Sequence, residues 1–149
     1  MNIKNALVSA FLGMAILALP AAAEELSGEG QTPGTKVVIT SLKRDAGGTV
    51  TVRFQLINDG EKEVSTYGVF GEYFGLEYLS LVDTANKKKY LVVKDSAGGC
   101  LCSNFKADVV PGSRFNLWAK FPAPPDTVQK ITVVIPTFEP IESVPITAP

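Results

Sequence analysis

The chain has 149 residues, a formal net charge of −1 and no histidine. This length suits one domain with a buried core. Lack of histidine removes the commonest general base and the commonest metal ligand, so Ser-His-Asp and Cys-His catalysis are excluded. The near-neutral charge argues against nucleic acid as a partner, and against adhesion to anionic membranes by charge alone.

Residues 1–23 have the pattern of a secretory signal peptide. Lys4 supplies a positive start, residues 6–19 form an apolar run, Pro20 breaks that run, and three alanines ending at Ala23 offer a cleavage site. The apolar run is shorter than the roughly 20 residues that a membrane span needs, and two glutamates follow it at once. We therefore expect removal of this segment and a periplasmic or secreted protein that does not span the membrane.

Residues 24–34 are rich in Gly, Glu, Ser and Pro, and this composition predicts a flexible leader with too little apolar surface to order itself. From residue 35 the chain changes to short β-rich runs separated by turn residues. The clearest run alternates strictly, with Val50, Val52, Phe54 and Leu56 on one face. The predicted strands are 35–43, 49–58, 77–83, 88–95, 114–121, 128–135 and 142–147. Pro145 in the last run suits an edge strand or a strand end.

About seven strands at regular spacing, without a helical stripe outside residues 1–23, predict an all-β fold. The architecture that fits best is an antiparallel, immunoglobulin-like β-sandwich over residues 35–149. A closed barrel is the competing architecture, and strand number alone does not separate the two.

Residues 49–64 read T-V-T-V-R-F-Q-L-I-N-D-G-E-K-E-V. An alternating strand that closes on Asn58-Asp59-Gly60, with Val64 just beyond, resembles the second strand and turn of small bacterial secreted immunoglobulin-like domains. That group, also called telokin-like or immunoprotective extracellular proteins, implies an adhesion, binding or accessory module and not a catalyst. The chain departs from immunoglobulin domains, in which the order is Cys, Trp, Cys and the cysteines bridge two sheets. Here Cys100 and Cys102 are nearly adjacent, so they cannot bridge two sheets, and Trp118 follows both.

Cys100 and Cys102 have the only chemically unusual spacing. Residues two apart on an extended chain face the same side, and their Cα separation can fall in the roughly 4.4–6.8 Å that a disulfide accepts. In an oxidising compartment a local disulfide in a surface loop is the favoured interpretation. A redox-active dithiol, a Cu(I) site and an intermolecular bridge are the alternatives. A Cu(I) site would lack methionine support, because Met1 and Met14 leave with residues 1–23.

Residues 67–78 form an aromatic segment in which five aromatic side chains alternate with three glycines. Such a segment either recognises a protein or a sugar, or folds its rings down over one end of the sandwich. Trp118, on the polar face of its strand, is either exposed or covered by the same segment. For contact with a partner we select the following side chains: Tyr67, Phe70, Tyr73, Phe74 and Trp118.

Two groups of charged residues suggest no site. Lys87-Lys88-Lys89 fits a solvated hairpin tip better than an anion site. The scattered acidic residues match no calcium-binding loop, so no metal or cofactor is expected.

Together these features predict a non-catalytic binding or accessory module, secreted or periplasmic, whose partner is a protein or a cell-envelope component. A thiol-based redox or Cu(I) role at Cys100 and Cys102 is the alternative. A structural envelope protein without a specific ligand is the third possibility.

Overall fold

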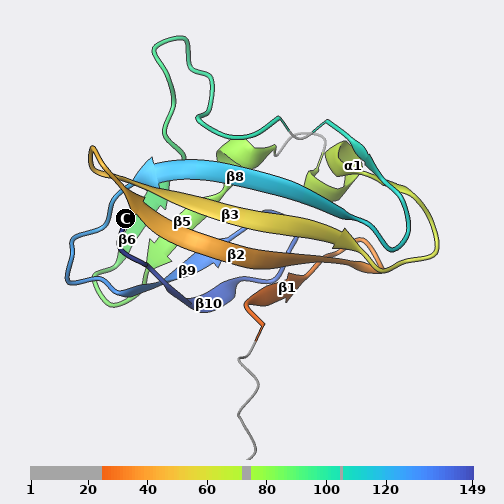
Figure 1. The fold of residues 1–149 in the computed structure, drawn as a ribbon, viewed down its shortest axis with the longest axis horizontal. Helices are drawn as coiled ribbons and strands as arrows, with labels where there is room; N and C mark the ends of the chain where they lie inside the picture. Colours follow the sequence, from red (N-terminus) through yellow and green to blue (C-terminus); the bar gives the residue numbers. More distant parts are fainter. Residues whose placement is uncertain (1–24, 72–74, 105) are drawn as a thin grey trace, which may run out of the picture.

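Two antiparallel sheets packed face to face make up the computed structural model, which describes residues 25–71, 75–104 and 106–149 (Figure 1). The predicted signal peptide, residues 1–23, lies outside these residues. The first sheet has the order β1-β2-β3-β8, formed by Ser27–Glu29, Thr35–Asp45, Thr49–Asn58 and Arg114–Pro122. The second sheet has the order β10-β9-β5-β6, formed by Ile141–Pro145, Lys130–Val134, Ser80–Asp83 and Lys88–Leu91.

Short elements fill the connections between the sheets. A small ladder pairs β4 (Val64–Ser65) with β7 (Asp108–Val109), and the connection from β3 to β5 contains the helix α1 (Thr66–Phe70) and the 3-10 helix η1 (Leu76–Tyr78). Neither helical turn was predicted, because an element of three to five residues is too short for helical periodicity to be recognised in the sequence.

The topology is that of an immunoglobulin-like sandwich. If β2, β3 and β8 are taken as strands A, B and E, then β5, β6, β9 and β10 are strands C, C′, F and G, and the two sheets read A-B-E and G-F-C-C′. This is the strand order of immunoglobulin sheets. The predicted all-β sandwich is therefore confirmed, and the barrel alternative is wrong. Each predicted run overlaps an observed strand, and Pro145 ends the edge strand β10.

The core lies between the sheets, as the alternation in β3 predicts. Val50, Val52, Phe54 and Leu56 are at most 1% exposed. Opposite Phe54 in the ladder, Leu117 of β8 is buried on the same face. Burying such a side chain contributes roughly 1.5–3 kcal/mol, so this alternating face stabilises much of the fold.

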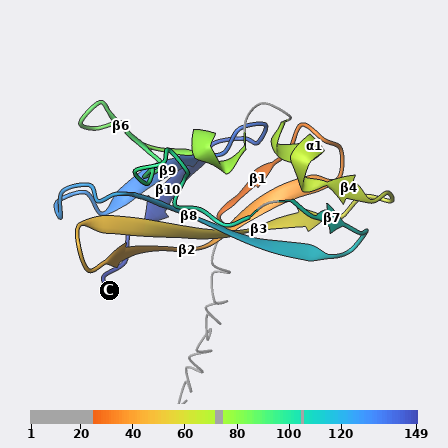
Figure 2. The same ribbon diagram turned by 90° about the horizontal axis from the view of Figure 1, so that it is seen from above.

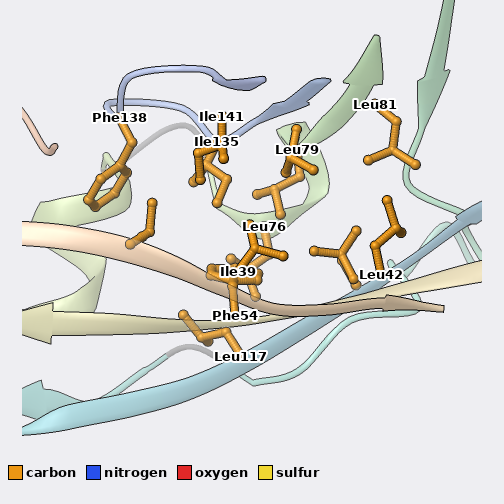
Figure 3. Close-up of a cluster of buried hydrophobic side chains, with 14 of the residues drawn as sticks. Ile39, Leu42, Phe54, Leu76, Leu79, Leu81, Leu117, Ile135, Phe138 and Ile141 are labelled. Carbon is orange, nitrogen blue, oxygen red and sulfur yellow. The ribbon is translucent and has the colours of Figure 1, made fainter. Parts of the chain in front are cut away.

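Side chains from the second sheet and its connections complete the core. Figure 3 shows Leu79, Leu81 and Ile141 on one side of the cluster, with Ile39 and Phe54 across from them. The two sheets thus share one apolar core, and buried side chains of the β3–β5 connection pack into the same core.

The flexible leader predicted for residues 24–34 is wrong over part of its length. Ser27–Glu29 forms β1, which pairs with β2 so that Gly28 lies opposite Val37. Gly28 is buried, and a Cβ atom there would collide with the carbonyl oxygen of Glu139. The glycine that suggested disorder therefore permits close packing. The ordered domain begins before residue 35.

Candidate functional site

Helix α1, with which the aromatic segment begins, lies in the connection between β3 and β5, toward the end of the long axis that is opposite β6 (Figures 1 and 2). The helix is amphipathic despite its length. Thr66, Val69 and Phe70, spaced at i, i+3 and i+4, are at most 3% exposed, whereas Tyr67 points outward. Helix α1 is thus anchored by one face and presents the other to solvent.

Phe70 is a core residue and not a contact residue. Its side chain is 0% exposed, and its ring centroid lies 6.4 Å from that of Phe54, edge-on, and 5.6 Å from that of Phe138. Edge-to-face aromatic packing of this kind stabilises a buried cluster. The prediction that Phe70 contacts a partner is wrong in this conformation, because its neighbours in space come from β3 and the β9–β10 connection.

Tyr67 is the exposed aromatic side chain of α1. Its side chain is 42% exposed and borders an open hollow of about 460 Å³. The other residues that line this hollow are Ser65, Lys106, Ala107 and Asp108. An aromatic ring beside hydroxyl, ammonium and carboxylate groups offers both apolar area and hydrogen-bonding groups to a partner.

Thr66 fixes the position of this surface. Its backbone N–H donates to the carbonyl oxygen of Ala107 over 2.9 Å, and the N–H of Ala107 donates to the Thr66 hydroxyl over 2.9 Å. Next to this pair, Ser65 lies opposite Asp108 in the β4–β7 ladder. Two distant loops are therefore tied together beneath Tyr67, which restricts its freedom before any partner arrives.

Of the remaining aromatic residues selected from the sequence, Trp118 alone falls within the part of the chain that the structure describes. Tyr73 and Phe74 lie outside the described residues. Trp118 is half-buried on β8, opposite Arg53 in the β3–β8 ladder, and not on α1. Its carbonyl oxygen accepts a hydrogen bond of 2.9 Å from the N–H of Ser103.

Some residues of this surface were not selected from the sequence. Lys106 and Asp108 carried no signal, because only the hydrogen bonds of Ala107 to Thr66 and the β4–β7 ladder place them beside Tyr67. Tyr78, which does not line the hollow, lies within the predicted aromatic segment and is 52% exposed on η1, so its place in that segment was the signal that could have found this exposed ring.

Cys100 and Cys102 are paired as a disulfide, with their Cα atoms 5.3 Å apart. The local pair that the spacing predicts is therefore present. Both side chains pack partly against the core, whereas Leu101 between them points outward. The turn before them is closed by Asp95, whose carboxylate accepts hydrogen bonds of 2.9 Å from the N–H groups of Ala97 and Gly99.

Two carboxyl groups have shifted pKa values, and both have structural partners. The ammonium of Lys120 donates to Asp45 over 2.8 Å and, with the hydroxyl of Thr51, lowers the pKa of Asp45. The side-chain amide of Asn86 donates to Asp83 over 2.7 Å and lowers the pKa of Asp83 at the base of the lysine-rich turn. Both groups therefore favour the carboxylate form and lie away from the hollow beside Tyr67.

Within residues 25–71, 75–104 and 106–149, no three His, Cys, Asp or Glu side chains gather as a metal site would require. Over the same ranges, no helix has the length and apolar character needed to cross a bilayer.

Comparison with known proteins identifies no family for this chain. No protein-family model matches it, and neither does any curated protein. The resemblance to small secreted immunoglobulin-like domains accordingly stays a prediction, and the functional argument depends on the geometry of the molecule itself.

Proposed function

We propose that this protein is a non-catalytic binding or accessory module of the periplasm or the extracellular space, and that it engages a protein or cell-envelope partner through Tyr67. The observation that carries the proposal is the exposed ring of Tyr67 on α1, whose opposite face is buried, beside the hollow that Lys106 and Asp108 line. Aromatic side chains held in this way are typical centres of protein interfaces, because they bury large area at a small entropic cost.

The place of α1 in the fold supports the proposal. The connection from β3 to β5 corresponds to the B–C loop, which forms part of the binding end of immunoglobulin variable domains. The β9–β10 connection corresponds to the F–G loop at the same end, and the hydroxyl of Thr137 in it donates to the carbonyl oxygen of Val69 over 2.5 Å. The two loops are therefore joined, as a preorganised binding end requires.

Site-specific photo-crosslinking in the source organism tests the proposal. A benzoylphenylalanine at position 67 should give one defined adduct, whereas the same group at Leu91, which is 59% exposed on β6 toward the other end, should not. Equal adducts at both positions, or none at position 67, would contradict the choice of surface.

The partner recovered from that adduct then permits a direct measurement of affinity. Tyr67→Ala should weaken binding by about 2 kcal/mol, a loss of roughly thirtyfold, if Tyr67 is a hot spot. Leu91→Ala is the matched control and should leave the affinity unchanged. Thermal unfolding of both variants shows whether the fold is retained, and a folded Tyr67→Ala variant with full affinity would refute the proposal.

Export across the membrane is tested separately by the intact mass of the protein isolated from the periplasm or the medium. Cleavage after Ala23 predicts a mature chain that begins at Glu24. A mass that includes residues 1–23 would contradict the secreted or periplasmic part of the proposal without affecting the choice of binding surface.

A further inference from the structure

The β8 edge of the first sheet is closed by a junction of three residues. Val93 donates its N–H to the carbonyl oxygen of Lys120 over 2.9 Å, Lys120 donates to Leu101 over 2.9 Å, and Leu101 donates to Val93 over 2.8 Å. Val93 follows β6 of the second sheet, and Lys120 belongs to β8 of the first. This closed ring of hydrogen bonds, here called the β8 junction, therefore joins the two sheets along one open side of the sandwich.

Residues 100–103 occupy the place of strand D, which pairs with strand E in constant-type immunoglobulin domains. Cys102 forms an isolated antiparallel bridge with Ala119 of β8. One residue further, the N–H of Ser103 donates to the carbonyl oxygen of Trp118 over 2.9 Å, but the N–H of Trp118 donates to the hydroxyl of Ser103 over 3.0 Å. The β8 edge is thus covered by a short, irregular segment in place of a full strand.

The disulfide lies at the centre of this segment. Cys100 and Cys102 flank Leu101, and their Cα separation of 5.3 Å is shorter than the roughly 6.6 Å of two residues in an extended strand. The bond therefore holds the chain contracted at the residue that contacts both Val93 and Lys120. Since the bond encloses one residue, it restricts the unfolded chain little, and its effect is expected to be local.

We propose that the Cys100–Cys102 disulfide is a redox latch on the β8 edge: the intact bond keeps residues 100–103 paired with β8, and its reduction releases them. A thiolate of a dithiol reductant attacks one sulfur of the bond and forms a mixed disulfide, and the second thiol of the reductant then displaces the protein sulfur. Two electrons and two protons pass to the protein, which leaves two cysteine thiols, and the reductant becomes a disulfide. Residues 100–103 then detach from β8.

Opening the latch uncovers backbone groups that pair readily with another strand. The N–H of Lys120 and the carbonyl oxygen of Trp118 lose their partners, and β8 becomes an open sheet edge. The β2–β3 and β3–β8 ladders do not include residues 100–103, so the sandwich itself remains folded. The latch therefore changes the exposure of one edge and does not depend on a partner at Tyr67.

Amide hydrogen exchange followed by NMR tests this inference. The oxidised protein is compared with the same protein in excess dithiothreitol. Reduction should speed exchange at Leu101, Ser103 and Lys120 by about tenfold or more, whereas amides in the β2–β3 ladder change by less than about twofold. Unchanged exchange at the β8 junction, or equal acceleration in all strands, would overturn the latch, as would a bond that dithiothreitol leaves intact.

Two variants keep the test independent of the reductant. The double variant Cys100→Ser with Cys102→Ser should show the fast exchange of the reduced protein, and dithiothreitol should not change it further. Ser103→Ala removes one hydrogen bond to β8 without touching the disulfide, so it should speed exchange at Trp118 in the oxidised protein and change it by less than about twofold in the reduced protein, in which residues 100–103 have already left β8. A double variant with the slow exchange of the oxidised protein would also overturn the latch.

Discussion

The two open sides of the sandwich are closed by different means. On the β8 side, Val93 and Leu101 join Lys120 next to a disulfide. On the β2 side, Thr147, just beyond β10, donates its N–H to the carbonyl oxygen of Leu42 over 2.9 Å and accepts a hydrogen bond of 2.9 Å from the N–H of Arg44. Each side thus links the sheets through residues that follow an edge strand, but only one side has a covalent bond.

The β2 side is also closed by the charged side chain of Arg44. The guanidinium of Arg44 donates to the carbonyl oxygens of Pro124, Pro125 and Val128 over 2.7, 3.0 and 3.1 Å. Arg44 thereby fastens the β8–β9 turn to β2, where its side chain is 17% exposed. Hydrogen bonds with a partly buried charge contribute to the stability of the whole domain, whereas a disulfide that encloses one residue acts locally. We therefore expect the side with the covalent bond to contribute less to the stability of the whole domain than the β2 side.

Removing the closure of the β2 side should have the largest effect. Deletion of residues 146–149 removes the hydrogen bonds of Thr147 and the partly buried side chain of Ile146. We expect the free energy of unfolding to fall by about 3 kcal/mol, measured by urea denaturation. Deletion of residues 148–149 alone is the control and should cost less than about 0.5 kcal/mol. Equal stability of the two truncated proteins would show that Thr147 does not close this side.

Arg44→Ala should have the next largest effect. The substitution leaves three carbonyl oxygens of the β8–β9 turn without their charged donor, and we expect a loss of about 2 kcal/mol in the free energy of unfolding. Arg53→Ala is a matched control, because Arg53 is exposed on the outer face of β3, and it should change stability by less than about 0.5 kcal/mol. A similar loss in both variants would refute the role assigned to Arg44.

Removing the disulfide should affect global stability less than either change on the β2 side. The double variant Cys100→Ser with Cys102→Ser is expected to lower the free energy of unfolding by less than about 1 kcal/mol, because the bond encloses one residue. Urea denaturation of the double variant beside Arg44→Ala measures the difference directly. A loss larger than that of Arg44→Ala would reverse the comparison between the two sides.

The strands could be predicted from the sequence because their signal is local. Alternation in residues 49–58 and 114–121 places the correct side chains in the core, and β3 begins and ends where the pattern does. β1 was missed because Gly28 indicates flexibility in isolation, and its close packing against Glu139 is a tertiary contact. Local periodicity therefore determines which runs form strands, but not which glycines are buried.

The candidate site could be predicted only in part. The cysteine pair was accessible because its geometry depends on residues two apart in the chain. Tyr67 and Phe70 look equivalent in the sequence. Phe70 is buried because it packs against Phe54 and Phe138, which are distant in the chain, so this difference could not be predicted. The β8 junction had no sequence signal at all, since it combines residues from three separate parts of the chain.

The smallest predicted effect concerns the charge pair that links β2 to β8 across the first sheet. Because Lys120 and Thr51 hydrogen-bond to the Asp45 carboxylate, its pKa in the folded protein lies below the usual value of 3.8. Folding therefore favours the ionised form, and the stability that Asp45 contributes is present above about pH 4 and lost as the pH falls through its lowered pKa.

Asp45→Asn measures this contribution. The variant should be less stable than the parent protein by a constant amount between about pH 5 and 7, and the difference should shrink below about pH 4, as followed by urea denaturation at each pH. In a Lys120→Met background the same substitution should lose most of this pH dependence, because the largest cause of the lowered pKa is then absent. If the stability difference caused by Asp45→Asn depended on pH as strongly in the Lys120→Met background, the ion pair with Lys120 would not be the cause of the lowered pKa of Asp45.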